Sequence, residues 1–426
     1  MSITKKKKKK YLDSIVMIYV ILNVLYVFIS SVLFTNNIIY YSWYGKSMIF
    51  ALIINTIFSI TLFMIKKFKI KDFKFHLIDV LLPFMTVFAI ISVVFAISKY
   101  AALYGFFLRY EGVFAILYYY SLLYISSFVK KDYKKIIVYI IITTGVIDSM
   151  YGFLQLNMNS HVKIFYKLGK PVVNGFNNNS NFFATYILLS LSYAIGLFVD
   201  NKDITMKTLF GMIIIILSVG LFISNTRSCV LGLFFVLIYS LFFCVKNKKY
   251  KEIIIAFILI SLVGIYLHFN NKTNLLEAFI GTKNETVNLI KGNYDGKYGA
   301  KRLDVWKYSL LISPHYFLHG VGIDNFAFAF GGKSIVVGNY SFDKAHNEYI
   351  QILITQGLFA LISYLILVFS TLFSGIKSSI KNKNIYLVLP VIGYLVQAFF
   401  NISVIEVAPI FYLSIGLLIE RNALEK

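Results

Sequence analysis

Twelve long apolar runs constrain the fold of this chain of 426 residues more than any other feature of its sequence. Most of them are close to the ~20 residues that an α-helix needs to cross ~30 Å of hydrocarbon. Since a helix satisfies its own backbone hydrogen bonds, the pattern predicts an all-α polytopic membrane protein with about twelve transmembrane helices. The runs cover residues 11–34, 45–65, 77–97, 112–129, 134–153, 181–199, 205–224, 228–245, 253–269, 348–374, 385–401 and 406–420.

One long segment, 270–347, is too polar to lie in a membrane, and it separates the ninth apolar run from the tenth. The sequence therefore predicts three regions. Residues 1–269 form a nine-helix membrane region, residues 270–347 form a large loop with short amphipathic helices, and residues 348–426 form a three-helix membrane region. We expect the functional residues to lie in or beside this loop.

The positive charge lies in the links between runs and gives the predicted orientation. With the N-terminus in the cytoplasm, the inside links hold more positive charge than most outside links, as the positive-inside rule requires. Both termini are then cytoplasmic and the segment 270–347 faces outward. The inside groups are the lysines within 5–10, 66–74, 130–135, 202–207, 246–251 and 377–383, followed by Arg421 and Lys426.

The charged residues and their distribution indicate which kind of molecule the protein binds. Only 14% of the residues are charged, whereas soluble domains have about 25%. The net charge of +23 does not indicate nucleic acid, because the lysines are spread over links and do not gather on one folded face. Membrane lipids with anionic headgroups, or a lipid-linked phosphate, are the expected partners.

Three residues on the predicted outer side of the membrane are candidates for chemistry. Arg227 lies between two apolar runs with almost no loop, where it either reaches lipid headgroups or binds an anion through its planar donors. Arg302 begins a stretch in which Leu303, Trp306 and Leu310 recur at helical spacing, so it either lies on a solvated face or points toward a ligand. His346 precedes the tenth span, where it either caps a helix or accepts a proton from a hydroxyl group.

Motifs for metals and common cofactors are not found in the sequence. The chain has no HExxH, paired-cysteine or carboxylate cluster, and no Walker-type loop or GxSxG elbow. We therefore predict no metal and no cofactor.

These three positions, taken in order with their neighbours, resemble the O-antigen ligase and O-antigen polymerase (Wzy-like) family of polytopic glycosyltransferases. The resemblance covers about residues 175–360. The matching stretches are 175–184, 225–228, 302–306 through 320–326, and 346–349 with 356–358.

The resemblance implies a GT-C-like fold and a metal-independent, inverting transfer of glycan from an undecaprenyl-pyrophosphate carrier at the outer face of the cytoplasmic membrane. Arg227 and Arg302 match the family arginines that hold the pyrophosphate, and His346 matches the histidine that activates the acceptor hydroxyl. Arg109, in a family-like Arg-Tyr-Glu-Gly stretch, is a possible accessory contact. Asn347 and Trp306, beside the other candidates, are further accessory residues.

Two positions depart from the family pattern. Residues 177–179 read Asn-Asn-Asn where Asn-Pro-Asn is usual, and Lys344 occupies a place where members often have a second histidine. The acceptor stays open between another glycan unit, a lipid or wall polymer, and a protein side chain. Ligase activity and polymerase activity therefore both stay open as predictions.

Two other classes of function remain as alternatives. A transporter or flippase of lipid-linked sugars predicts paired halves and charged groups at the bilayer midplane. Asp79 and Asp148 are the only acids well inside early spans, and we expect both to be close enough to span ends to be solvated. A structural membrane protein needs no catalytic group, so it predicts tolerance to substitution at His346.

Overall fold

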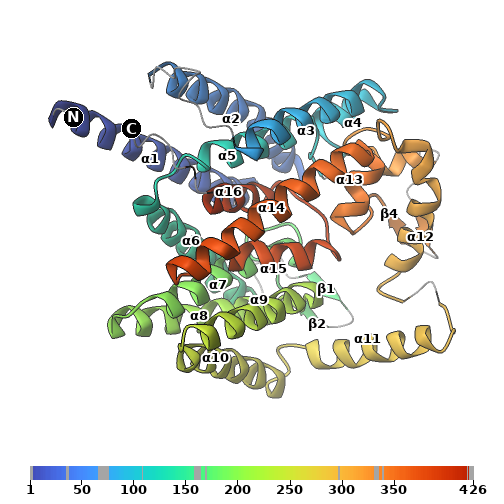
Figure 1. Ribbon diagram of the computed structural model, residues 1–426. Helices are drawn as coiled ribbons and strands as arrows, with labels where there is room; N and C mark the ends of the chain where they lie inside the picture. The colour runs from blue at the N-terminus through green and yellow to red at the C-terminus, as the bar shows by residue number, and fades with distance from the viewer. Residues whose placement is uncertain are drawn as a thin grey trace.

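The computed structural model describes residues 3–34, 38–65, 76–107, 109–157, 165–167, 170–295, 298–330, 335–337, 340–419 and 421. It is predominantly helical (Figure 1). The α-helices are α1 (Ile3–Phe34), α2 (Ile38–Ile65), α3 (Leu77–Val94), α4 (Lys99–Tyr104), α5 (Val113–Ser126), α6 (Lys131–Asn157), α7 (Ser180–Asp200), α8 (Ile204–Ile223), α9 (Arg227–Lys246), α10 (Tyr250–Phe269), α11 (Leu275–Ile290), α12 (Arg302–Ile312), α13 (Glu348–Gln356), α14 (Leu358–Asn382), α15 (Leu389–Ala398) and α16 (Ala408–Leu418).

Short elements complete the fold. Two antiparallel hairpins pair β1 (Phe165–Lys167) with β2 (Lys170–Val172) and β3 (Ile335–Val337) with β4 (Tyr340–Phe342). They add a small amount of sheet to a chain that we predicted to be all-α. Two 3-10 helices, η2 (Ser313–Tyr316) and η3 (Phe326–Phe330), lie in the long loop.

Nine helices in the described ranges are long and apolar enough to cross a membrane, namely α1, α2, α3, α6, α7, α8, α9, α10 and α14. Three shorter apolar helices, α5, α15 and α16, fall on the remaining predicted spans at 112–129, 385–401 and 406–420. This pattern fits a multi-pass membrane protein, as the sequence predicted. The count of twelve crossings stays a prediction.

Helix α7 lies at the centre of the bundle. Its residues from Phe182 to Val199 are all buried, and it packs against α6, α8, α9 and α15. The helix starts where the side chain of Asn179 accepts a hydrogen bond from the Asn181 backbone N–H at 2.9 Å, which satisfies one of the free donors of a helix start.

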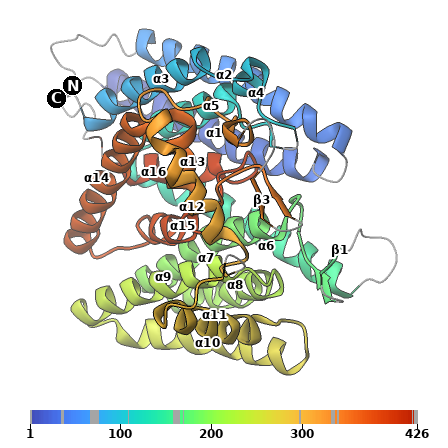
Figure 2. The same cartoon turned by 90° about the vertical axis from the view of Figure 1, so that its right-hand side faces the viewer.

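The long loop gathers at one end of the bundle. In Figure 1 the two ends of the chain are drawn at the left, whereas α11, α12 and the β3–β4 hairpin lie at the right. Figure 2 turns this right-hand end toward the viewer and shows α12 crossing in front of the bundle. The segment 270–347 therefore forms a folded layer over the end of the bundle opposite to the termini.

The structure divides the predicted span 348–374 into two helices. Gly357 has a φ of +90°, and a Cβ atom at this position would lie 2.7 Å from the Phe317 carbonyl oxygen. The Leu358 N–H donates to that same oxygen at 2.7 Å, so the helical ladder is interrupted. Among its described residues, region 348–426 contains the helices α13, α14, α15 and α16, and α13 is the short segment that Gly357 separates from α14.

Helix α12 buries a different face from the one that its apolar pattern indicated. Val305 and Ser309 are buried, whereas Leu310 is 52% exposed. Val305 packs into a small core of the loop with Val321, Phe326, Ala345 and Ile354. Helix α12 contacts α13, so packing against protein decides which face of α12 is covered.

The expectation that Asp79 and Asp148 are solvated was wrong. Both residues are buried because both have partners. Asp79 forms an ion pair with Arg421 in which the side chains are 6% and 3% exposed. Asp148 accepts hydrogen bonds from the Phe176 N–H at 2.8 Å and from the Asn177 side chain at 3.1 Å.

Candidate active site

Helix α11 brings the first residues of α9 and α12 together. Arg227 begins α9, and its Nη1 atom donates to Thr282 Oγ1 on α11 at 2.6 Å. One turn further along α11, Glu285 Oε2 accepts from the Gly299 N–H at 3.0 Å, in the turn that leads into α12. Arg302 is the first residue of α12 and follows Gly299 by three positions, so α11 contacts both the Arg227 side chain and the turn before Arg302.

In the part of the chain that the structure describes, the guanidinium group of Arg302 has no counter-charge. The side chain is mostly buried, and within the described residues it makes no hydrogen bond or ion pair. Burial, and then the positive charge of Arg227, lower the pKa of Arg302 from 12.5 to about 10. A buried cation with a second cation beside it is favourable only when an anion joins them. This part of the site is therefore complementary to an anion.

The imidazole of His346 lies in the same region of positive charge. Burial, followed by the charges of Arg302 and Arg109, lowers the pKa of His346 from 6.5 to about 3. The ring contacts Phe342 edge-on at 5.5 Å, and its Nδ1 atom is buried with no hydrogen-bond partner in the described part of the chain. The imidazole is consequently neutral at physiological pH and has a free lone pair.

The backbone is strained at both parts of the site. His346 has a φ of 49°, and Ala300 and Lys301, directly before Arg302, have φ of 57° and 68°. Residues with a Cβ atom adopt this left-handed conformation at a cost of roughly 1–2 kcal/mol each. Such strain persists only where surrounding contacts fix the backbone, and it is concentrated at functional sites.

Contacts on both sides of His346 fix its position. Trp306, one turn after Arg302, donates from Nε1 to the Ala345 carbonyl at 3.0 Å. Asn347 is buried, and its side-chain oxygen accepts from the first N–H groups of α13 at 3.0 Å. Two of the predicted accessory residues thus hold the backbone around the histidine.

The third predicted accessory residue, Arg109, contacts the same loop through an ion pair. Its Nε and Nη2 atoms donate to the two carboxylate oxygens of Asp343 at 2.6 and 2.9 Å. Burial would raise the pKa of Asp343, but the hydrogen bonds and charge of Arg109 outweigh it and keep the pKa below its usual 3.8. Unlike Arg302, therefore, Arg109 already has an anionic partner.

Sequence reasoning missed the residues that connect the candidates. The pairing of Arg109 with Asp343 and the two α11 contacts depend on segments far apart in the chain, and no local pattern indicates them. The family-like stretch 320–326 includes a turn. A Cβ atom on Gly320, whose φ is +69°, would lie 2.2 Å from the Thr355 carbonyl oxygen, so only glycine permits this close approach.

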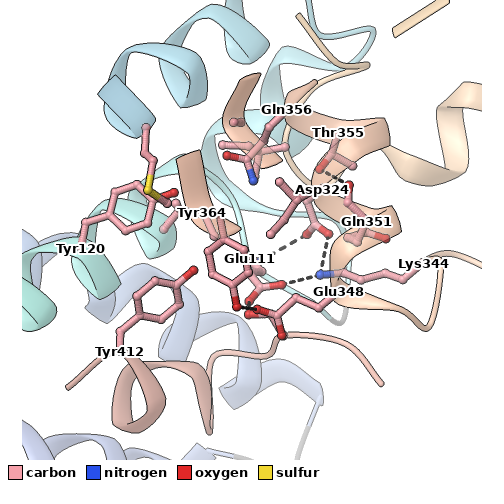
Figure 3. A pocket seen from close by; sticks show the side chains of 16 residues that line it. Glu111, Tyr120, Asp324, Lys344, Glu348, Gln351, Thr355, Gln356, Tyr364 and Tyr412 are labelled. Carbon is pink, nitrogen blue, oxygen red and sulfur yellow. Dashed lines mark hydrogen bonds and ion pairs between the residues drawn. The ribbon is translucent and has the colours of Figure 1, made fainter. Parts of the chain in front are cut away.

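A cavity of about 40 Å³ lies beside this loop but is not lined by Arg227, Arg302 or His346. Its lining includes Glu111, Lys344 and Glu348, which Figure 3 shows pointing toward one another. A cavity of this size accommodates water and not a sugar. The residues that we predicted to bind substrate therefore lie outside this cavity.

Part of the chain matches a known protein family. Residues 212–365 match the family model described as O-antigen ligase, and this range contains Arg227, Arg302 and His346. No curated protein matches the chain. The match over these residues supports the O-antigen ligase, Wzy-like family that the sequence resemblance indicated.

Proposed function

We propose that this protein is a membrane glycosyltransferase that takes glycan from an undecaprenyl-pyrophosphate carrier at the outer face of the cytoplasmic membrane. The family match supports an enzyme of polysaccharide assembly that acts on lipid-linked glycans. The lysine-rich links support an orientation with both termini in the cytoplasm. The layer formed by 270–347 then faces outward, where the carrier presents its glycan.

This proposal rests on the guanidinium of Arg302, which lies beside Arg227 and has no anionic partner within the described ranges. A pyrophosphate has the charge and the oxygen geometry that two guanidinium groups match. In the reaction, the acceptor oxygen attacks the anomeric carbon while the bond from that carbon to the pyrophosphate oxygen breaks. Arg227 and Arg302 stabilise the charge that builds on the departing pyrophosphate, which explains how transfer proceeds without a metal.

His346 takes the proton of the acceptor hydroxyl in this scheme. In the free protein the imidazole is a weak base, since burial and nearby arginines lower its pKa. A bound pyrophosphate offsets the charge of Arg302 and so raises the pKa of His346. Binding of the donor therefore prepares the base, and a single displacement on the opposite face of the sugar inverts the configuration.

The transporter alternative receives no support from the buried acids. Asp148 and Asp79 both hold structural partners, the turn at 176–177 and Arg421 respectively. Neither is a free charge on a path across the membrane.

Transfer by the purified protein from a lipid-linked oligosaccharide tests the proposal. We expect Arg227→Ala, Arg302→Ala and His346→Ala each to abolish transfer while the protein still reaches the membrane, with a loss of roughly 10²–10⁴-fold for the base. His315→Ala, which changes an exposed histidine of the same loop, is the matched control and should retain activity. The chain length of the product distinguishes polymerase from ligase. Full activity in all three site variants would overturn the mechanism.

A further inference from the structure

Lys344 forms the centre of a buried group of charges next to the candidate site. Its Nζ atom donates to Glu111 Oε2 at 2.5 Å and lies 3.2 Å from Asp324 Oδ1, as Figure 3 shows. The three side chains are only 3%, 5% and 2% exposed. One cation thus joins two carboxylates away from water.

The two carboxylates come from segments far from Lys344 in the sequence. Asp324 Oδ2 accepts from the Phe106 N–H at 2.5 Å, so the turn at 320–325 is attached to the link before α5. Glu111 Oε1 accepts from Ser403 Oγ at 2.5 Å, which attaches that link to the segment before α16. Lys344 therefore connects three separate parts of the chain to the loop that carries His346.

The residues next to Lys344 are fixed as well. The Ala345 N–H donates to Gln351 Oε1 at 2.9 Å, and its carbonyl accepts from Trp306. His346 follows in the left-handed conformation with a φ of 49°. A non-glycine residue keeps such a conformation only while its neighbours are held on both sides. The Lys344 group is the most buried of these attachments.

We propose that Lys344, Glu111 and Asp324 are positioning residues that hold His346 in its reactive conformation. They do not touch the reacting atoms, and they act through the backbone of residues 344–346. The catalytic part of this inference rests on the proposed function, because it assigns the base role to His346. The positional part concerns only the loop.

In this proposal the positive charge of residue 344 is required to hold the two carboxylates together, whereas the exact shape of its side chain is not. Loss of the ammonium leaves two buried carboxylates facing each other without a counter-ion, which drives the segments apart. Arginine keeps the charge and can bridge two carboxylates. The cavity of about 40 Å³ that adjoins Lys344 leaves room for the larger guanidinium group.

The test compares Lys344→Met, Lys344→Arg and Arg421→Met in the full-length protein in detergent micelles. Arg421→Met is the matched control, because it breaks the similarly buried pair with Asp79 in the first turn of α3, outside the loop layer. We expect Lys344→Met to lower kcat on the order of 10²-fold with an unchanged KM for the lipid-linked donor, since Arg227 and Arg302 remain in place. Lys344→Arg should recover most of this loss, and Arg421→Met should retain kcat.

A second readout does not depend on glycan transfer. Diethyl pyrocarbonate acylates accessible neutral imidazoles, and mass spectrometry of the peptide containing His346 gives its rate of modification. We expect Lys344→Met to accelerate this rate by about 10-fold through local opening, whereas Arg421→Met leaves it unchanged. If the wild-type protein transfers no glycan, the proposed function fails, and the labelling still tests the positioning. The inference would be overturned if Lys344→Met kept the wild-type kcat and the wild-type labelling rate of His346. It would also be overturned if Arg421→Met changed kcat and the labelling rate as much as Lys344→Met does.

Discussion

Replacing Arg302 by methionine should stabilise the free protein while removing its response to pyrophosphate. Burial, and then the charge of Arg227, lower the pKa of Arg302 from 12.5 to about 10. At about 1.4 kcal/mol per pKa unit, this lowering means that the folded state disfavours the charged guanidinium by about 3 kcal/mol. Because the unfolded chain carries the same charge in water without this cost, the wild-type arginine destabilises the empty site.

The expected shift in melting temperature follows from chain length. Unfolding entropy of about 2.1 cal/mol/K per residue gives about 0.9 kcal/mol/K for this chain, so each kcal/mol moves Tm by about 1 °C. Arg302→Met should therefore raise Tm by up to about 3 °C. A ligand at 100 times its Kd adds about 2.7 kcal/mol, so inorganic pyrophosphate should raise the wild-type Tm by about the same amount.

Thermal unfolding in detergent micelles, with and without inorganic pyrophosphate, measures both effects. Arg109→Met is the control of opposite sign, because it leaves the part-buried carboxylate of Asp343 without its bidentate partner and should lower Tm. The reasoning fails if Arg302→Met melts below the wild type in the absence of ligand, or if pyrophosphate stabilises the variant as much as the wild type.

Three further predictions concern the loop around the site. The folded protein takes up a proton on His346 near pH 3 and the unfolded chain near pH 6.5, so wild-type stability should fall as pH drops below about 6.5, by about 2 kcal/mol at pH 5. His346→Gln should lack this part of the loss when unfolding midpoints at pH 7.5 and pH 5 are compared, and an identical pH dependence would contradict the assignment. Trp306→Phe removes the hydrogen bond to the Ala345 carbonyl. The loss of about 1 kcal/mol of interaction should lower the transfer rate by up to about fivefold, whereas the control Trp43→Phe should leave the rate unchanged. Equal transfer rates for the two variants would refute the role of the indole. In Gly320→Ala the new Cβ atom would clash with the Thr355 carbonyl, so this variant should lose at least about 1–3 kcal/mol of stability. Gly292→Ala is the control, because Gly292 has a similar φ and a Cβ atom there would have no atom within 4 Å, and it should lose less. Equal losses of stability would show that the close approach at Gly320 is unimportant.

The long apolar helices could be predicted from the sequence. The run at 205–224 corresponds to α8 at Ile204–Ile223, and the run at 253–269 falls within α10 at Tyr250–Phe269. These agreements have a local cause, because a helix in hydrocarbon satisfies its backbone hydrogen bonds within one segment. Apolar length is therefore sufficient information. The break at Gly357 could not be predicted in the same way, because it depends on the carbonyl of Phe317 from another segment.

The site was only partly visible in the sequence. The family resemblance indicated Arg227, Arg302 and His346, but not what holds them. Tertiary structure alone shows that Arg302 has no counter-charge among the described residues, whereas Arg109 has Asp343. The reason is physical: whether a buried charge is free or paired depends on atoms that meet only when distant segments fold against one another. The sequence by itself determined which segments are helices and which residues carry charge, and the packing of the loop against the bundle decided which of those charges remains available for a ligand.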